Sequence, residues 1–575
     1  MIMKIMKSIW IVLPCCLMIN CEDILDKTNL SAVNEAAAWD NLELASAYVF
    51  EIYDDNLPNW DRGISDRSDE SDEGDAYMYG QLTENSVNNW PYGSIRNINI
   101  LLANIDGGSL EEASKNRIKG EALFFRAWNY FEMVRLYGGV PLLLEPQEIT
   151  DDLLVERAST SEVFDQIIVD LDDAINYLPA IPASSGDNNG RVHKGTALAL
   201  QGRVLLYYAS PQFDPDQSAA GRWQDAYDAS KAAKDQLVAD GYGLYDDFGG
   251  LWFDEMNKEV IFVRRYEYPN KIDGSHWSAA TRPLDVSQGA AGANQPVLEM
   301  VDAFPMKDGR AIDDVTSDYT YDPNYFWQNR DPRFNATIVH NGSVWELNGE
   351  TGRIQWTFVG AESNSPTETG FYCRKAVDPG LDANLAYNNP TDFIEIRFAE
   401  VLLNLAEAAN KVGVTNEAYD ELIALRTRAG IDPGNDNMYG LSTGMSQDEM
   451  QDAIIIERKI ELAFEGKRHW DLRRNRMFED RLNGARRHGH SIVLLVDKDA
   501  FFDMVGSMTT QEAIDHLSTN YTDYFRHDVV ERDIQFTINW LPEYYFYALP
   551  QDHTRLNSNL EQTMGWPGGT FDPLQ

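Results

Sequence analysis

The chain has 575 residues, of which 43% are hydrophobic, and it carries a formal net charge of −44. Phosphate recognition depends on clustered Lys and Arg, so an excess of 92 acidic over 48 basic side chains argues against a nucleic-acid-binding protein. The hydrophobic content is ample for a large core, in one big domain or in several ordinary ones. We attribute the acidity to solubility rather than to a cationic ligand.

The first twenty residues predict a secretory signal. Lys4 and Lys7 precede the apolar run IWIVLPCCLMI, which has the length of a signal h-region and is too short to span a bilayer. Cys21 stands where this run meets acidic residues, and the border resembles a bacterial lipoprotein signal, which is cut before a cysteine that then takes a lipid. We therefore expect a signal peptide over residues 1–20 and lipidation of Cys21. Asn20 departs from the small residue usual before the cut, and ordinary cleavage with Cys21 incidental is the alternative.

Amphipathic patterns dominate the next part of the chain. Residues 114–141 read as a long, half-buried helix, which Gly138, Gly139 and Pro141 end. Similar helical patterns occur near residues 34–54, 94–106, 160–178, 193–209 and 223–239. These patterns predict that the first part of the chain forms a helical scaffold.

The character of the sequence changes near residue 240. Short β-branched and aromatic runs, VIFVRRYEY, RFNATIVHNG and GRIQWTFVG, alternate with Gly, Asn, Asp and Pro, which predicts loops with short strands over about 240–390. Helical periodicity returns in TDFIEIRFAEVLLNLAEAANKVG, where one stripe is Phe398, Val401, Leu402, Leu405 and Ala409. Paired helices with short loops suggest stacked helix–turn–helix units, as in tetratricopeptide solenoids, although no strict repeat is visible.

Motifs for chemistry are nearly absent. The chain lacks H-E-x-x-H, a P-loop and G-x-S-x-G, and it has only nine His. Carboxylates are too frequent for a glycosidase pair to stand out. The acidic segment 65–75 raises the possibility of calcium, but with Asp69 in the first position of an EF-hand loop, Gly80 falls where the bidentate Glu belongs. We therefore expect a solvated loop there, no metal and no cofactor.

Four stretches, in order, resemble blocks of the SusD/RagB family of Bacteroidetes outer-membrane lipoproteins. They are IKGEALFFRAWNYFEMVRLYGGVPLL, NQPVLEMVDAFPMKDGR with RDPRFNATIVHNG, IEIRFAEVLLNLAEAAN, and IIIERKIELAFEGKRHWDLRRN. The opening CEDILDK and the ending YYFYALPQDHTRLNSNLEQTMGW are also similar to that family. The resemblance covers nearly the whole mature chain.

The resemblance implies a mainly α fold: a tetratricopeptide-like helical-repeat scaffold with an irregular, loop-rich ligand-binding face and a few short strands. It implies a single domain over residues 21–575, with a helical part at about 30–240, a loop-rich insert at about 240–390 and a helical part at about 391–575. Such proteins are lipid-anchored and exposed on the outer membrane, where they form a lid on a SusC-like TonB-dependent transporter. They capture glycans in most branches and peptides in the RagB-like branch, and they are not catalysts.

The charged C-terminal block has a structural interpretation. Its acidic and basic residues alternate among apolar ones, as expected for ion pairs that fix a helix end against its neighbours. They are Glu457, Arg458, Glu461, Glu465, Arg468, Asp471 and Arg474. An active site built from the same residues is the alternative.

A sugar site needs a flat aromatic ring for the C–H face and fixed polar groups for the hydroxyls. Two loops, 56–93 and 268–285, combine Trp with such groups. The glycan-binding candidates are Trp277, Trp60 and Trp90, with Asp66, Arg67, Asp69 and Arg282 around them. Trp128 and Trp470 lie within helical patterns and are assigned to the core.

Three functions remain open from the sequence. The first is a surface protein that hands an oligosaccharide to a transporter. The second is the same lid for peptides or another nutrient, and the third is an acidic secreted hydrolase.

Overall fold

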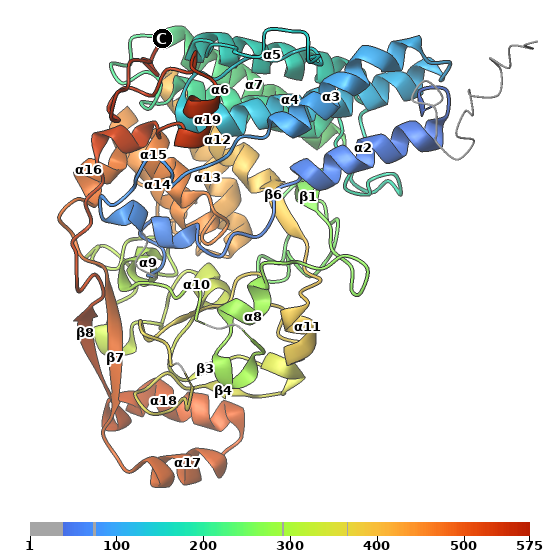
Figure 1. Ribbon diagram of the computed structural model, residues 1–575. Coiled ribbons are helices and arrows are strands. Elements are labelled where there is room, and N and C mark those ends of the chain that lie inside the picture. The colour runs from blue at the N-terminus through green and yellow to red at the C-terminus, as the bar shows by residue number, and fades with distance from the viewer. Residues whose placement is uncertain (1–37, 73–75, 290–291, 365) are drawn as a thin grey trace, which may run out of the picture.

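The computed structural model describes residues 38–72, 76–289, 292–364 and 366–575. The fold is mainly helical with a few short two-stranded sheets, which confirms the predicted tetratricopeptide-like class (Figure 1). The predicted signal peptide and Cys21 lie outside the described residues. Within these ranges, no helix combines the length and the apolar composition that a membrane span requires.

The first helices form one layer, at the top of Figure 1. They are α2 (Leu42–Asn56), α3 (Tyr92–Asn104), α4 (Glu112–Tyr137), α5 (Thr160–Tyr177), α6 (Lys194–Ala209) and α7 (Ala220–Ala239). Local signals set their ends: α5 begins with a capping box made by Ser159 and Glu162. Gly138 ends α4 at φ 74°, where a Cβ atom would lie 2.7 Å from the Cβ of Pro573.

Helices from the second half of the chain complete this layer. They are α12 (Phe398–Lys411), α13 (Thr415–Ala429), α14 (Gln447–Glu461), α15 (Arg468–Arg474) and α16 (Met477–Arg481), with α19 (Gln551–Leu556) near the C-terminus. α12 packs against α6 and α7 as well as against α13 and α14. The largest hydrophobic cluster joins side chains from both halves. The helical layer is therefore one unit built from distant parts of the sequence.

Below the helical layer, residues 240–390 form short elements joined by long connections (Figure 1). The helices are α8 (Trp277–Thr281), α9 (Leu298–Ala303), α10 (Pro332–Thr337) and α11 (Ala383–Tyr387). The antiparallel strand pairs are β1 (Val260–Arg264) with β6 (Phe393–Arg397), β2 (Ile338–Val339) with β5 (Tyr372–Cys373), and β3 (Ser343–Val344) with β4 (Ile354–Gln355). Between these elements lies a second hydrophobic cluster.

Two local predictions were wrong. The helix predicted to cover the whole stretch from Thr391 begins only at Phe398, because Phe393–Arg397 pairs with β1 as β6. Its aromatic Phe393 and its β-branched Ile394 and Ile396 suit a strand when a partner is present. In RFNATIVHNG the first half is α10, which Asp331 caps, and only Ile338–Val339 is a strand.

A long hairpin extends away from the helical layer. β7 (His488–Leu494) and β8 (Phe525–Glu531) pair over their full lengths, and between them the chain forms α17 (Lys498–Gly506) and α18 (Thr510–Tyr524). These two helices lie at the bottom of Figure 1. The hairpin stands within the part of the chain that was predicted to be helical.

The charged block forms buried ion pairs, which confirms its structural interpretation. Arg397 donates to Glu461 and Glu465 of the block and to Glu259. Arg474 donates to Glu407 at 2.6 Å and to Asp471 at 2.8 Å. These side chains are almost completely enclosed. The block therefore fastens α14 and α15 to β6 and α12.

Candidate functional site

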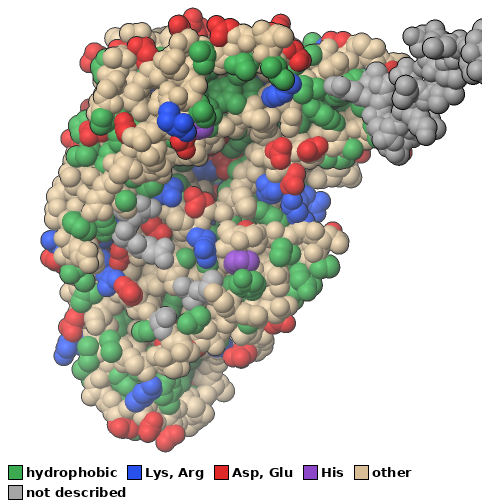
Figure 2. Space-filling view, in the orientation of Figure 1, with side chains coloured by type: hydrophobic (Ala, Val, Ile, Leu, Met, Phe, Trp, Pro, Cys, Tyr) green, Lys and Arg blue, Asp and Glu red, His purple; other side chains and the backbone are tan. Residues whose placement is uncertain are grey.

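A pocket of about 360 Å³ opens where the helical layer meets the loop-rich part. Its lining includes residues of the loop 58–67, of α4 and of the connection between α14 and α15. Figure 2 shows the surface hollowed at this boundary, with basic and acidic side chains inside the hollow. The volume is within the range of pockets that hold small ligands.

Trp60 and Trp277 form one wall of the pocket. Their rings are stacked with centroids 4.6 Å apart and planes 20° apart, and only 5% of Trp60 and 1% of Trp277 are exposed. The Trp60 indole N–H donates to the Thr391 carbonyl at 3.1 Å. The sequence predicts Trp277 as an open platform, but the structure covers it with Trp60 and the second hydrophobic cluster. Its removal is therefore a change to the core as well as to the pocket.

The prediction that Trp470 belongs to the core is only partly correct. Its side chain is half-buried, packs against the edge of the large hydrophobic cluster and also lines the pocket. The Arg135 guanidinium lies 3.6 Å from the centre of its ring, in cation–π geometry. Trp128 is buried in the large cluster as predicted, and it also lines the pocket. The helical pattern around Trp470 could not reveal that the side chain faces a cavity.

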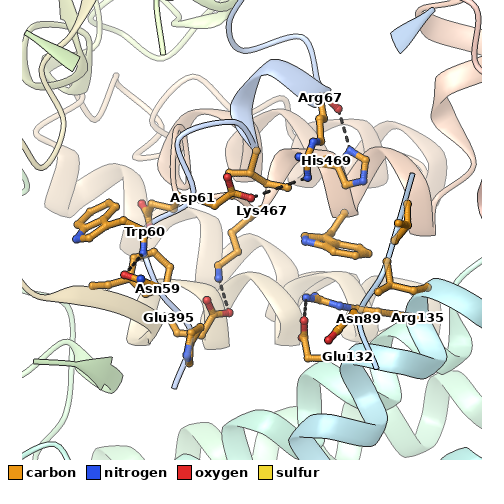
Figure 3. Close-up of a pocket in the computed structure, with 18 of the residues that line it drawn as sticks. Asn59, Trp60, Asp61, Arg67, Asn89, Glu132, Arg135, Glu395, Lys467 and His469 are labelled. Carbon is orange, nitrogen blue, oxygen red and sulfur yellow. Dashed lines mark hydrogen bonds and ion pairs between the residues drawn. The ribbon is translucent and has the colours of Figure 1, made fainter. Parts of the chain in front are cut away.

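The polar lining consists of ion pairs from different elements (Figure 3). Lys467 reaches across the pocket and donates to Glu395 at 2.7 Å, while Arg135 donates to Glu132 one turn earlier on α4. The sequence predictions missed these residues. Glu132 and Arg135 interrupt the apolar pattern of α4 at a spacing of three, which is the signal that could have drawn attention to them.

Arg67 lies at the mouth of the pocket. Its guanidinium is 4.2 Å from the centre of the Tyr77 ring and 3.9 Å from Asp61, and its carbonyl is 2.8 Å from Nδ1 of His469. Burial lowers the pKa of His469 to about 3, so this histidine is neutral at pH 7.

The other polar candidates are held inside the protein. Asp69 accepts from Arg468 at 2.7 Å and from Lys459 at 3.0 Å; burial opposes its charge, but these two cations hold its pKa well below the usual range. Asp66 accepts from Ser71, and Arg282 donates to the Leu381 carbonyl at 2.9 Å. None of these three candidates lines the pocket.

Trp90 lies at a different cavity, of about 200 Å³. Its ring stacks on His553 with centroids 4.8 Å apart. The structure therefore brings Trp60, Trp277 and Arg67 to one pocket and leaves Trp90, Asp66, Asp69 and Arg282 outside its lining. In the described parts of the acidic segment and elsewhere in the described chain, no group of three or more His, Cys, Asp or Glu is arranged to hold a metal ion.

A family model described as the SusD family matches residues 258–566, more than half of the chain. The chain belongs to the SusD family. A SusD-like model described as "Starch-binding associating with outer membrane" matches residues 10–206. The two matches together extend over both halves of the helical layer.

Individual relatives agree with this assignment. The SusD-like protein P2 of Formosa agariphila is 27% identical over 439 residues, which cover 71% of this chain and 77% of that protein. A solved SusD-like protein of Bacteroides fragilis superposes with a TM-score of 0.73 at 25% identity, covering 92% of this chain and 98% of its own. A SusD-like carbohydrate-binding protein of the same species gives a TM-score of 0.70 at 21% identity, covering 91% of this chain and 100% of its own.

Proposed function

We propose that this SusD-family chain is a lipoprotein of the outer-membrane surface that binds a nutrient oligosaccharide and delivers it to a SusC-like TonB-dependent transporter. The observation that carries the proposal is the pocket, which combines aromatic rings with fixed polar side chains. A sugar presents a C–H face and a rim of hydroxyl groups, and it needs both kinds of contact.

Trp470 is the best-placed platform for a sugar ring. It is the more exposed of the aromatic walls, and Arg135 supports the indole ring. Asn59, Asp61 and Arg67 surround the entrance and supply donors and acceptors for hydroxyl groups. Trp60 and Trp277 then act as a rigid apolar wall.

The lining favours binding over catalysis. Glycoside hydrolysis needs one carboxylic acid and one carboxylate placed on either side of the scissile bond. Here the lining carboxylates Glu132, Glu395 and Glu465 each form an ion pair with Arg or Lys. Burial raises the pKa of Glu132, although Arg135 pairs with it. Burial opposes the charge of Glu395 and Glu465, but the neighbouring cations hold their pKa below the usual range, so these two are poor proton donors. This supports a non-enzymatic role.

Calorimetric titration with a panel of oligosaccharides tests the binding proposal. Replacing Trp470 by Ala removes the ring platform, and we expect binding to weaken by about 1 to 3 kcal/mol, the scale for covering a large side chain. Trp90→Ala is the matched control, because Trp90 lies at the other cavity, and it should bind like the wild type. Equal affinities for wild type and Trp470→Ala would remove this pocket from the function, while binding of peptides alone would favour the peptide-lid alternative.

Anchoring and partnership rest on the family and on the predicted signal. We expect Cys21→Ser to move the protein from the membrane fraction to the soluble fraction, because several acyl chains are needed for stable attachment. The wild type, extracted in mild detergent, should bring an outer-membrane barrel with it. Membrane retention of the variant in cells that lack the transporter would contradict lipidation at Cys21.

A further inference from the structure

We infer, on the basis of the proposed function, that the pocket selects uncharged glycans and discriminates against uronic-acid and sulfated ones. Two independent features carry this inference. One is the pairing of every charged group in the described lining, and the other is the charge of the whole chain.

The charges of the lining balance. Among the described residues, four cations and four carboxylates face the pocket. The cations are Arg67, Arg135, Arg203 and Lys467, and the carboxylates are Asp61, Glu132, Glu395 and Glu465. His469 adds no charge, because burial lowers its pKa to about 3. An incoming anion therefore meets as many carboxylates as cations.

Each lining cation also has a carboxylate partner. Arg203 pairs with Glu395 at 2.6 Å and with Glu400 at 2.7 Å, and Lys467 shares Glu395 with it. Arg135 pairs with Glu132. The side chains of these three cations are at most 10% exposed, and their charge is neutralised by carboxylates of the protein itself.

Arg67 is the most accessible cation of the pocket. Its side chain is 27% exposed, but Asp61 lies 3.9 Å away and is 53% exposed. A sulfate or carboxylate that approached Arg67 would therefore also approach Asp61. Like charges placed together cost several kcal/mol, which would cancel the attraction of the guanidinium.

A neutral sugar avoids these costs. A hydroxyl group both donates and accepts, so it can bind beside an intact ion pair without separating the two charges. A buried anion without a cation of its own must instead pay its desolvation energy. In addition, the net charge of −44 repels polyanionic chains at long range before they reach the pocket.

The experiment titrates wild-type protein with neutral gluco-, manno-, galacto- and xylo-oligosaccharides and with uronic-acid and sulfated oligosaccharides of equal length. We expect neutral chains to bind with an affinity that does not depend on ionic strength, since salt screens only charge interactions. Anionic chains should bind at least about tenfold more weakly than neutral chains, because like charges in contact are unfavourable.

A single substitution should weaken the expected preference for neutral chains. Asp61→Asn removes the negative charge 3.9 Å from the Arg67 guanidinium, so the affinity of the variant for uronic-acid chains should rise relative to its affinity for neutral chains. Asp246→Asn is the control: it makes the same change of charge on an exposed residue outside the lining, and it should change the affinity for neither kind of chain.

The outcomes separate the two proposals. If anionic chains bind as tightly as neutral ones, and Trp470→Ala weakens both, the pocket binds glycans and the inference of neutrality is wrong. If no chain of either kind binds, the proposed function fails and the inference fails with it.

Discussion

Two regions of this protein are rich in charge, and they differ in how the charge is enclosed. In and around the C-terminal block, Arg474 and the two arginines that pair with its glutamates, Arg333 and Arg397, each reach two or more carboxylates, and all of these groups lie in the interior. At the mouth of the pocket, in contrast, Arg67 and Asp61 lie 3.9 Å apart and their side chains are 27% and 53% exposed. The comparison teaches that charge density alone does not mark a binding site. What marks it is polar groups fixed at the edge of an open space beside aromatic rings.

The largest expected effect is in the enclosed block. Arg474→Ala leaves Glu407 and Asp471 buried without this cation, and we expect the free energy of unfolding to fall by about 3 to 5 kcal/mol. Thermal and urea unfolding measure the loss. Arg526→Ala is the matched control, because Arg526 pairs with Asp528 at the surface, where such pairs contribute less than about 1 kcal/mol. Similar losses in the two variants would contradict the distinction between enclosed and exposed charge.

The next effect is at the pocket wall. Trp277→Ala removes a buried ring that stacks on Trp60, and such truncations cost about 3 to 5 kcal/mol. We expect the lower end, about 3 kcal/mol, because the space left behind joins the pocket and can fill with water. The melting temperature should fall and glycan binding should weaken at temperatures where the variant is folded. An unchanged melting temperature would show that Trp277 contributes little to the core.

The smallest effect concerns a third kind of region, where the titratable groups are buried without charge. His340, His490 and His527 surround Phe326, with ring centroids 5.6, 5.3 and 5.4 Å from it. Burial lowers the pKa to about 3 for His340 and His490 and to about 4 for His527. In the unfolded chain, where histidine pKa values are near 6.5, these histidines therefore bind protons at pH values at which they stay neutral in the folded state.

The direction in which stability changes with pH follows from this difference between the folded and unfolded pKa values. The stability that depends on neutral histidines is complete above pH 6.5 and is lost as the pH falls toward the folded pKa values of about 3 to 4. Between pH 7 and pH 6 we expect a loss of less than about 1 kcal/mol per histidine. Glu70, whose pKa burial raises to about 7, acts in the opposite direction in another part of the molecule.

A local measurement isolates the histidines. Hydrogen exchange of the β7–β8 amides, corrected for the intrinsic pH dependence of exchange, should show lower protection at pH 6 than at pH 7. His490→Gln removes one of the titrating groups and should reduce that dependence. Protection that stays constant between pH 7 and pH 5 would contradict the coupling.

The helices were the most predictable part of the fold. Periodicity and local end signals placed α3, α5 and α6 within two residues of the observed bounds, since a helix forms its hydrogen bonds between near neighbours. Strands were less predictable. Phe393–Arg397 became β6 only because β1, more than 120 residues earlier, supplies its partner.

The sequence by itself determined the helical scaffold, the SusD family and the absence of a familiar catalytic motif, because these depend on local patterns and on motifs in a fixed order. Only the tertiary structure decided which side chains face the pocket. Asp69 appeared to belong to an open acidic loop, but it pairs with Arg468, which lies 399 residues later in the chain. Trp470 was assigned to the core, but the fold leaves it half-buried at the edge of the large cluster, where it lines the pocket beside Arg135. Burial and ion pairing arise from contacts between distant segments, and no local pattern specifies which segments meet.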